Sequence, residues 1–178
     1  MHMSTPSTWH YPLWPAGPWR DWLADHGSLT RRLQRRCPSF AVLRLKQRIA
    51  RPHGDECGQL GLAPGQLAMV REVLLQCAGR PVVFAHSAVA LAGLRGPWVG
   101  LGKLGNRPLG AALFANPRVL RHPLEYRRLD ARHPLYRAAA THLAKAPRYL
   151  WARRSRFVLA GSPILVTEVF LPELLCLP

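Results

Sequence analysis

An arginine and a glutamate lie on apolar faces of two segments whose alternating residues are typical of β-strands. In residues 69–77 Arg71 shares a face with apolar residues, and in residues 164–170 Glu168 does the same. A charge among apolar side chains is costly unless it is paired or used. The two groups therefore either pair with each other or with neighbours, or bind a ligand, with Arg71 holding a carboxylate and Glu168 a hydroxyl in a dry pocket.

Each of these segments belongs to a predicted β-hairpin. The first hairpin joins residues 70–77 to 82–91 through Ala-Gly-Arg-Pro, and the second joins 156–159 to 164–171 through Ala-Gly-Ser-Pro. A glycine in a short connection between β-rich runs is the usual hairpin signal, and proline fits the start of the returning strand. The sequence therefore predicts an antiparallel sheet.

The remaining elements complete an α+β fold. Periodicity and capping residues predict further strands at 41–49 and 118–129, helices at 18–23, 28–36, 97–104, 108–114 and 134–145, and a loop at 51–66. Residues 1–17 are rich in Pro and Trp without a period and are expected to form an irregular lead-in. Residues 18–178 are then expected to form a single domain in which helices cover one face or end of the sheet.

The composition excludes several classes of protein. A hydrophobic fraction of 48% in 178 residues can build one core, and the uncharged, largely apolar stretch at residues 81–94 is too short to span a bilayer. No segment resembles a secretory signal. The four cysteines, Cys37, Cys57, Cys77 and Cys176, form no Cys-x-x-Cys motif, so we expect reduced thiols in a cytoplasmic protein.

The net charge of +16, from 25 basic and 9 acidic residues, attracts anions of any kind. Basic and aromatic residues mix at 149–156 as they do in nucleic-acid grooves, but a solvated charged face is the commoner origin of such a run. Residues 53–57 (HGDEC) contain metal-ligand types without a second ligand pair, so no metal is expected. Nucleotide-binding and hydrolase motifs are missing from the sequence, and no cofactor is expected.

Five motifs, taken in order, resemble the chorismate lyase family over residues 19–172. They are 27–33 (GSLTRRL), 70–75 (VREVLL), 104–110 (LGNRPLG) with the following Leu113 and Phe114, 151–156 (WARRSR) and 167–172 (TEVFLP). The resemblance implies an antiparallel sheet with helical flaps that close over an internal site. It also implies a cofactor-free, cytoplasmic lyase that converts chorismate into 4-hydroxybenzoate and pyruvate, the entry to ubiquinone synthesis. We expect a monomer.

The resemblance also assigns four site residues. Arg71 would bind the ring carboxylate together with the backbone N–H groups of Leu29 and Leu109, and Glu168 would bind the hydroxyl, where it could orient the ring or relay a proton. Arg71 and Glu168 are the expected catalytic residues. Leu29 stands where the family has a methionine, a change that a main-chain donor tolerates.

Two other functions remain open at this stage. The same architecture resembles the effector domains of some transcription regulators, which bind small molecules without catalysis, although 178 residues leave little room for a DNA-binding segment. A basic nucleic-acid-binding protein is the second alternative, and its affinity would fall steeply with salt.

Overall fold

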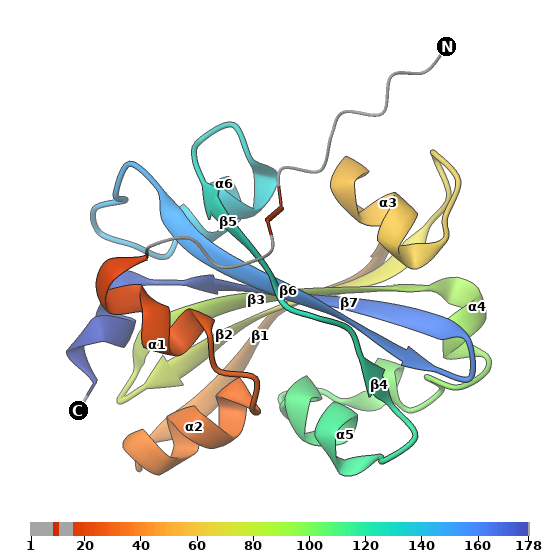
Figure 1. Ribbon diagram of the computed structural model, residues 1–178, viewed down its shortest axis with the longest axis horizontal. Helices are drawn as coiled ribbons and strands as arrows, with labels where there is room; N and C mark the ends of the chain where they lie inside the picture. Colours follow the sequence, from red (N-terminus) through yellow and green to blue (C-terminus); the bar gives the residue numbers. More distant parts are fainter. Residues whose placement is uncertain (1–8, 11–15, 178) are drawn as a thin grey trace.

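The computed structural model describes residues 9–10 and 16–177, which contain a seven-stranded antiparallel sheet (Figure 1). The spatial order of the strands is β1-β2-β3-β7-β6-β4, and β5 also pairs with β6. The strands are β1 (Phe40–Ala50), β2 (Ala68–Cys77), β3 (Arg80–Ala90), β4 (Leu120–Arg121), β5 (Glu125–Leu129), β6 (Leu150–Leu159) and β7 (Ser162–Phe170). The predicted α+β class with an antiparallel sheet is confirmed.

Both predicted hairpins are present, as β2–β3 and β6–β7. Their two-residue turns are Ala78-Gly79 and Ala160-Gly161, and all four residues have positive φ, between 46° and 76°. Two successive positive φ values match the twist of hairpin strands, and the glycines adopt them without strain. The second hairpin begins earlier than predicted, at Leu150 instead of residue 156.

Helices cover both faces of the sheet, whereas the sequence predicted one face or end. In Figure 1, α1 (Arg20–Leu23), α2 (Leu29–Arg36) and α5 (Leu109–Ala115) lie below the sheet, and α3 (Gly54–Leu60) and α6 (Pro134–Ala140) lie above it. The alternation of β2 shows the same division, because Val73 and Leu75 pack with α1 and α2 whereas Leu74 packs with α6. The central strands are therefore buried on both faces.

Several predicted elements have different boundaries. The loop expected at 51–66 contains α3, the helix at 134–145 ends at Ala140, and the strand at 118–129 is divided into β4 and β5. Residues 97–104 form turns with a 3-10 helix, η2 (Leu101–Lys103), and the other short helices are η1 (Gly17–Trp19), α4 (Leu91–Leu94) and η3 (Pro172–Cys176). Most of the predicted lead-in, 1–17, lies outside the described residues. Within the described ranges, no helix is long and apolar enough to cross a membrane.

The expectation of four reduced cysteines is wrong for one pair. Cys37 and Cys77 form a disulfide with their Cα atoms 5.8 Å apart, while Cys57 and Cys176 are free. Cys37 caps the C-terminus of α2, and the chain then enters β1, whose Phe40 lies opposite Cys77. The pairing depends on this turn, which residue spacing does not show. The disulfide ties the end of α2 to β2.

Candidate functional site

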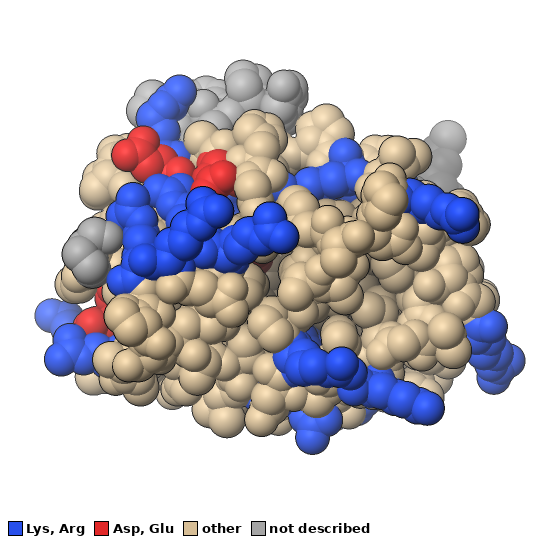
Figure 2. All heavy atoms as spheres, turned by 90° about the horizontal axis from the view of Figure 1, so that it is seen from below, with Lys and Arg blue, Asp and Glu red and all other residues tan. Residues whose placement is uncertain are grey.

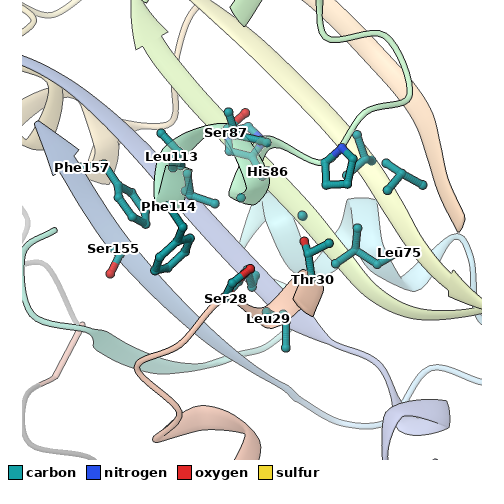
Figure 3. A pocket seen from close by; sticks show the side chains of 18 of the residues that line it. Ser28, Leu29, Thr30, Leu75, His86, Ser87, Leu113, Phe114, Ser155 and Phe157 are labelled. Atoms are coloured by element: carbon teal, nitrogen blue, oxygen red, sulfur yellow. The ribbon is translucent and has the colours of Figure 1, made fainter. Parts of the chain in front are cut away.

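A pocket lies between the sheet and the helices α2 and α5. In the close-up of Figure 3, Ser28, Leu29 and Thr30 face Leu113 and Phe114 across the opening, and Ser87, Ser155 and Phe157 come from the sheet. The four predicted site residues, Arg71, Glu168, Leu29 and Leu109, all line this pocket. The structure therefore brings together every position that the sequence selected.

Strand register explains why two hairpins contribute to one pocket. Arg71 on β2 lies opposite Ser87 on β3, Ser87 lies opposite Val166 on β7, and Val166 lies opposite Ser155 on β6. Residues opposite each other in a sheet project to the same face. Glu168 is two residues from Val166 and projects to that face as well.

Arg71 is held by a loop and has no acidic partner among the described residues. Its Nη2 donates hydrogen bonds of 3.0 Å to the carbonyl oxygens of Gly105 and Arg107, just before α5. Its Nε is buried without a partner, and the side chain as a whole is buried. A guanidinium that is fixed in place, still has free donors and has no counter-ion can bind an anion.

Glu168 pairs with a neighbour and not with Arg71. Its Oε2 accepts a hydrogen bond of 2.6 Å from Nε of Arg153, which lies opposite it on β6. Nη1 of Arg153 also donates to the carbonyl oxygens of Trp22 at 3.0 Å and Asp25 at 2.5 Å. Arg153 thus joins Glu168 to the chain that leads from α1 into α2.

Sequence reasoning missed Arg153 as a site residue. It treated residues 149–156 as a basic and aromatic run on a charged face, yet Arg153 is fully buried on a central strand. A signal was available, because Arg153 occupies the apolar alternation of a strand directly across the hairpin from Glu168.

Leu29 and Leu109 are the first residues of α2 and α5. Backbone N–H groups in the first turn of a helix have no partner within the helix, so both amides are free to bind a ligand in the pocket. Ser28 caps α2 by accepting a hydrogen bond from the Arg31 N–H. A Cβ at Gly110 would lie 3.4 Å from Thr30 Oγ1, so the glycine allows the two helices to approach closely at the pocket.

A buried ionic cluster lies on the reverse face of the sheet, under α3. The His86 ring is completely buried and lies between two carboxylates, with Nε2 3.1 Å from Glu56 Oε1 and Nδ1 3.4 Å from Glu72 Oε1. Burial alone would lower the pKa of His86, but Glu56 and Glu72 outweigh it and raise that pKa to about 9. His86 is therefore a cation at neutral pH, and it neutralises the buried Glu56 carboxylate, while Glu72 is also 3.4 Å from Nζ of Lys46.

The same cluster contains the side chains that the sequence considered as metal ligands. His53 and Glu56 lie with His86 so that one possible ligand atom of each falls within 4.8 Å of the others. The partner that the sequence did not find is His86, which comes from β3. His86 in this group also lies 3.4 Å from Glu72, so its ring is held between two carboxylates.

Basic side chains gather near the pocket. On the face seen in Figure 2, the largest blue group lies over α2, and a surface hollow there is lined by Arg31, Arg32, Arg35 and Arg36. The hollow shares Gly27 and Ser28 with the enclosed pocket. Anions that approach this side of the molecule therefore meet a positive potential.

Comparison with known proteins identifies a family. Residues 12–176 match the family model described as chorismate lyase. The chain is 56% identical over 156 residues to a probable chorismate pyruvate-lyase of Thiobacillus denitrificans, covering 88% of this chain and 83% of the relative. It is 46% identical over 178 residues to a probable chorismate pyruvate-lyase of Nitrosomonas europaea, covering 98% of each chain.

Solved structures share the fold at low sequence identity. The effector domain of PhnF from Mycobacterium smegmatis aligns with a TM-score of 0.55 at 16% identity, over 83% of this chain and 90% of that domain. The ligand-binding domain of a putative GntR-family transcriptional regulator from Bordetella bronchiseptica aligns with a TM-score of 0.54 at 19% identity, over 75% and 86%. These likenesses concern the fold alone.

Proposed function

The chain belongs to the chorismate lyase family, and we propose that it removes the enolpyruvyl group of chorismate to give 4-hydroxybenzoate and pyruvate. One observation carries the proposal beyond family membership. Arg71 and Glu168, from different hairpins, line the same enclosed pocket together with the first residues of α2 and α5. Such a pocket offers a cation and amide donors on one side and a carboxylate on the other.

Each of the four residues has a distinct role in this proposal. Arg71 and the N–H groups of Leu29 and Leu109 bind the ring carboxylate and replace the water that it loses on entry. Glu168 accepts a hydrogen bond from the ring hydroxyl through the carboxylate oxygen that Arg153 does not use. The ring is thereby fixed at both ends in one orientation.

The reaction itself is an elimination. The hydrogen on the hydroxyl-bearing carbon leaves as a proton, the ether bond on the adjacent carbon breaks, and the enol of pyruvate departs as the ring becomes aromatic. Orientation of the ring and desolvation of its charges are what this chain supplies. We assign Glu168 to positioning the hydroxyl, because one of its oxygens is already fixed by Arg153.

The test is direct. Purified protein is incubated with chorismate in buffer treated with a chelator, and 4-hydroxybenzoate and pyruvate are quantified. The proposal expects the two products in equal amounts at a rate far above spontaneous decay. Retention of chorismate, or its conversion to another isomer, would refute the proposed reaction.

The non-enzymatic effector domain is not favoured. The solved regulators share at most 19% identity among those compared above, whereas the family relatives reach 56%. A binding domain would retain chorismate unchanged in the assay just described. Nucleic-acid binding is supported by the net charge of +16 and the basic surface over α2, but no family relative reported above is named as a nucleic-acid-binding protein.

We also propose that the protein acts as a cytoplasmic monomer in ubiquinone synthesis, with residues 18–178 as its single domain. The resemblance to the family supports this. The Cys37–Cys77 disulfide is unusual for a reducing compartment, so thiol counting on protein isolated under alkylating conditions tests the location. Sedimentation tests the oligomeric state.

A further inference from the structure

We propose that Arg121 binds the second carboxylate of the substrate, the one on the enolpyruvyl group, and that a guanidinium thus stands at each end of the pocket. The inference rests on the proposed function and concerns the same site. Arg121, on β4, lines the pocket with Arg71, Leu29, Leu109 and Glu168. Neither the motifs nor the four predicted residues included it.

The pocket carries positive charge that no acidic side chain among the described residues balances. Glu168 and Arg153 form an ion pair and cancel. Arg71 and Arg121 make no ion pair with a carboxylate within the described ranges, which leaves two positive charges facing the pocket. Chorismate carries two carboxylates, and Arg71 accounts for one of them. A second cation complements the intact substrate, while 4-hydroxybenzoate has only one carboxylate to offer.

The Arg121 guanidinium is fixed in place yet keeps one donor for a ligand. Its Nε donates a hydrogen bond of 2.9 Å to Ser155 Oγ, and its Nη1 donates to the His26 carbonyl oxygen. Its central carbon lies 5.2 Å from the ring centroids of both Phe114 and Phe157. Nη2 has no hydrogen-bond partner in the part of the chain that the structure describes. Such preorganisation lowers the entropic cost of binding an anion.

Arg71 and Arg121 lie at opposite ends of the pocket floor. A row of opposing residues crosses β2, β3, β7 and β6, from Arg71 at one end to Ser155 at the other. Ser155 accepts a hydrogen bond from Arg121. Three strand spacings separate the backbones at the two ends by roughly 14 Å. Two arginine side chains that reach inward from such a separation leave room for a small ring acid between them, with Glu168 on β7 beside the middle of the row.

Partial burial makes the unbalanced charge on Arg121 energetically costly. Desolvation lowers the pKa of Arg121, and the nearby Glu168 only partly opposes this effect. A partly desolvated cation without its own counter-ion is costly unless a ligand supplies the charge. Nη1 of Arg121 also donates to the carbonyl oxygen of His26, just before Gly27 and α2. An anion bound to Arg121 therefore contacts the side chain that holds the segment leading into α2.

The test compares two ligands in matched variants. Arg121→Gln, Arg71→Gln and the control Arg118→Gln, an exposed arginine just before β4, each remove one positive charge. Affinity for 4-hydroxybenzoate is measured by calorimetry and kcat/KM is measured with chorismate. Loss of a charge-assisted hydrogen bond should reduce kcat/KM of Arg121→Gln by about 10- to 100-fold, while its affinity for 4-hydroxybenzoate stays within about twofold of the parent.

Three comparison variants separate the possible outcomes. Arg71→Gln should lower both kcat/KM for chorismate and the affinity for 4-hydroxybenzoate, and Arg118→Gln should change neither. Arg121→Lys should recover part of kcat/KM because it restores the charge. The inference is overturned if kcat/KM of Arg121→Gln for chorismate equals that of the parent. It is also overturned if kcat/KM for chorismate and affinity for 4-hydroxybenzoate fall by the same factor, which would mean that Arg121 only holds the segment leading into α2. A parent protein that does not turn over chorismate contradicts the proposed function itself, and this inference with it.

Discussion

Arg153 and Glu168 face each other across β6 and β7, joined by a hydrogen bond of 2.6 Å from Arg153 Nε to Glu168 Oε2. The same guanidinium binds the carbonyl oxygens of Trp22, in α1, and of Asp25, between α1 and α2. One buried cation therefore fixes both the carboxylate assigned to the substrate hydroxyl and the segment that leads into the flap helix.

Glu168→Gln is expected to reduce kcat for chorismate by about 10- to 100-fold. The amide keeps an oxygen that can accept from Arg153, so the fold should persist, but the substrate hydroxyl loses a charged acceptor. Turnover and thermal unfolding are measured side by side. An unchanged kcat in a folded variant would remove Glu168 from the site.

Arg153→Met is expected to lower the free energy of unfolding by about 3–5 kcal/mol, because it leaves Glu168 without its counter-ion. Denaturant unfolding measures this loss, and the double variant Arg153→Met/Glu168→Gln should be more stable than the sum of the two single losses predicts. Strict additivity would mean that the two groups do not interact.

Arg71→Ala is expected to weaken 4-hydroxybenzoate binding by at least about tenfold, since charged hydrogen bonds contribute about 1.5–3 kcal/mol each. Arg48→Gln is a suitable control, because it removes one charge from an exposed position on the edge strand β1. Equal affinities in the two variants would show that net charge, and not the pocket, determines binding.

Reduction of the Cys37–Cys77 disulfide is expected to lower the free energy of unfolding by about 2–4 kcal/mol. The measurement is unfolding with and without a reductant, and Cys57→Ser, which removes a free thiol, should respond to the reductant like the parent. A parent protein with four titratable thiols and no response to the reductant would contradict the cross-link.

His86 is expected to remain protonated at pH 7.5, since its pKa is raised to about 9. A group with a raised pKa in the folded state contributes stability that is complete below its unfolded value near 6.5 and is lost as the pH rises through about 9. Imidazole NMR signals followed from pH 6 to 10 report this directly. A neutral His86 at pH 7.5 would contradict the ion cluster.

The positions of Arg71 and Glu168 on apolar strand faces were predictable because they depend on local alternation, whereas Leu29 and Leu109 came from the family resemblance. Arg71 and Glu168 interrupt apolar faces of strands, and the hairpin turns that carry those strands have their own glycine signal. The alternation of apolar residues along a strand does not predict how far apart the two hairpins lie. The pairing of β3 with β7, which brings Arg71 and Glu168 to one pocket, is a long-range contact that no short motif encodes.

The missed features have the same origin. The roles of three missed side chains depend on contacts with residues far along the chain. These contacts are Arg153 with Trp22, Arg121 with His26, and His86 with Glu56. Helix α3 was missed for a different reason, because the surrounding Pro and Gly residues obscured its caps. The Glu56 carboxylate accepts from the His53 N–H at 2.8 Å, and Gly61 ends the helix with φ 66°.

The most direct test of the account is a crystal structure of the protein with 4-hydroxybenzoate bound. The account predicts the ligand between α2, α5 and the sheet, with its carboxylate on Arg71 and the N–H groups of Leu29 and Leu109, and its hydroxyl on Glu168. A ligand bound in the reverse orientation, or outside this pocket, would contradict the site that underlies the proposed reaction.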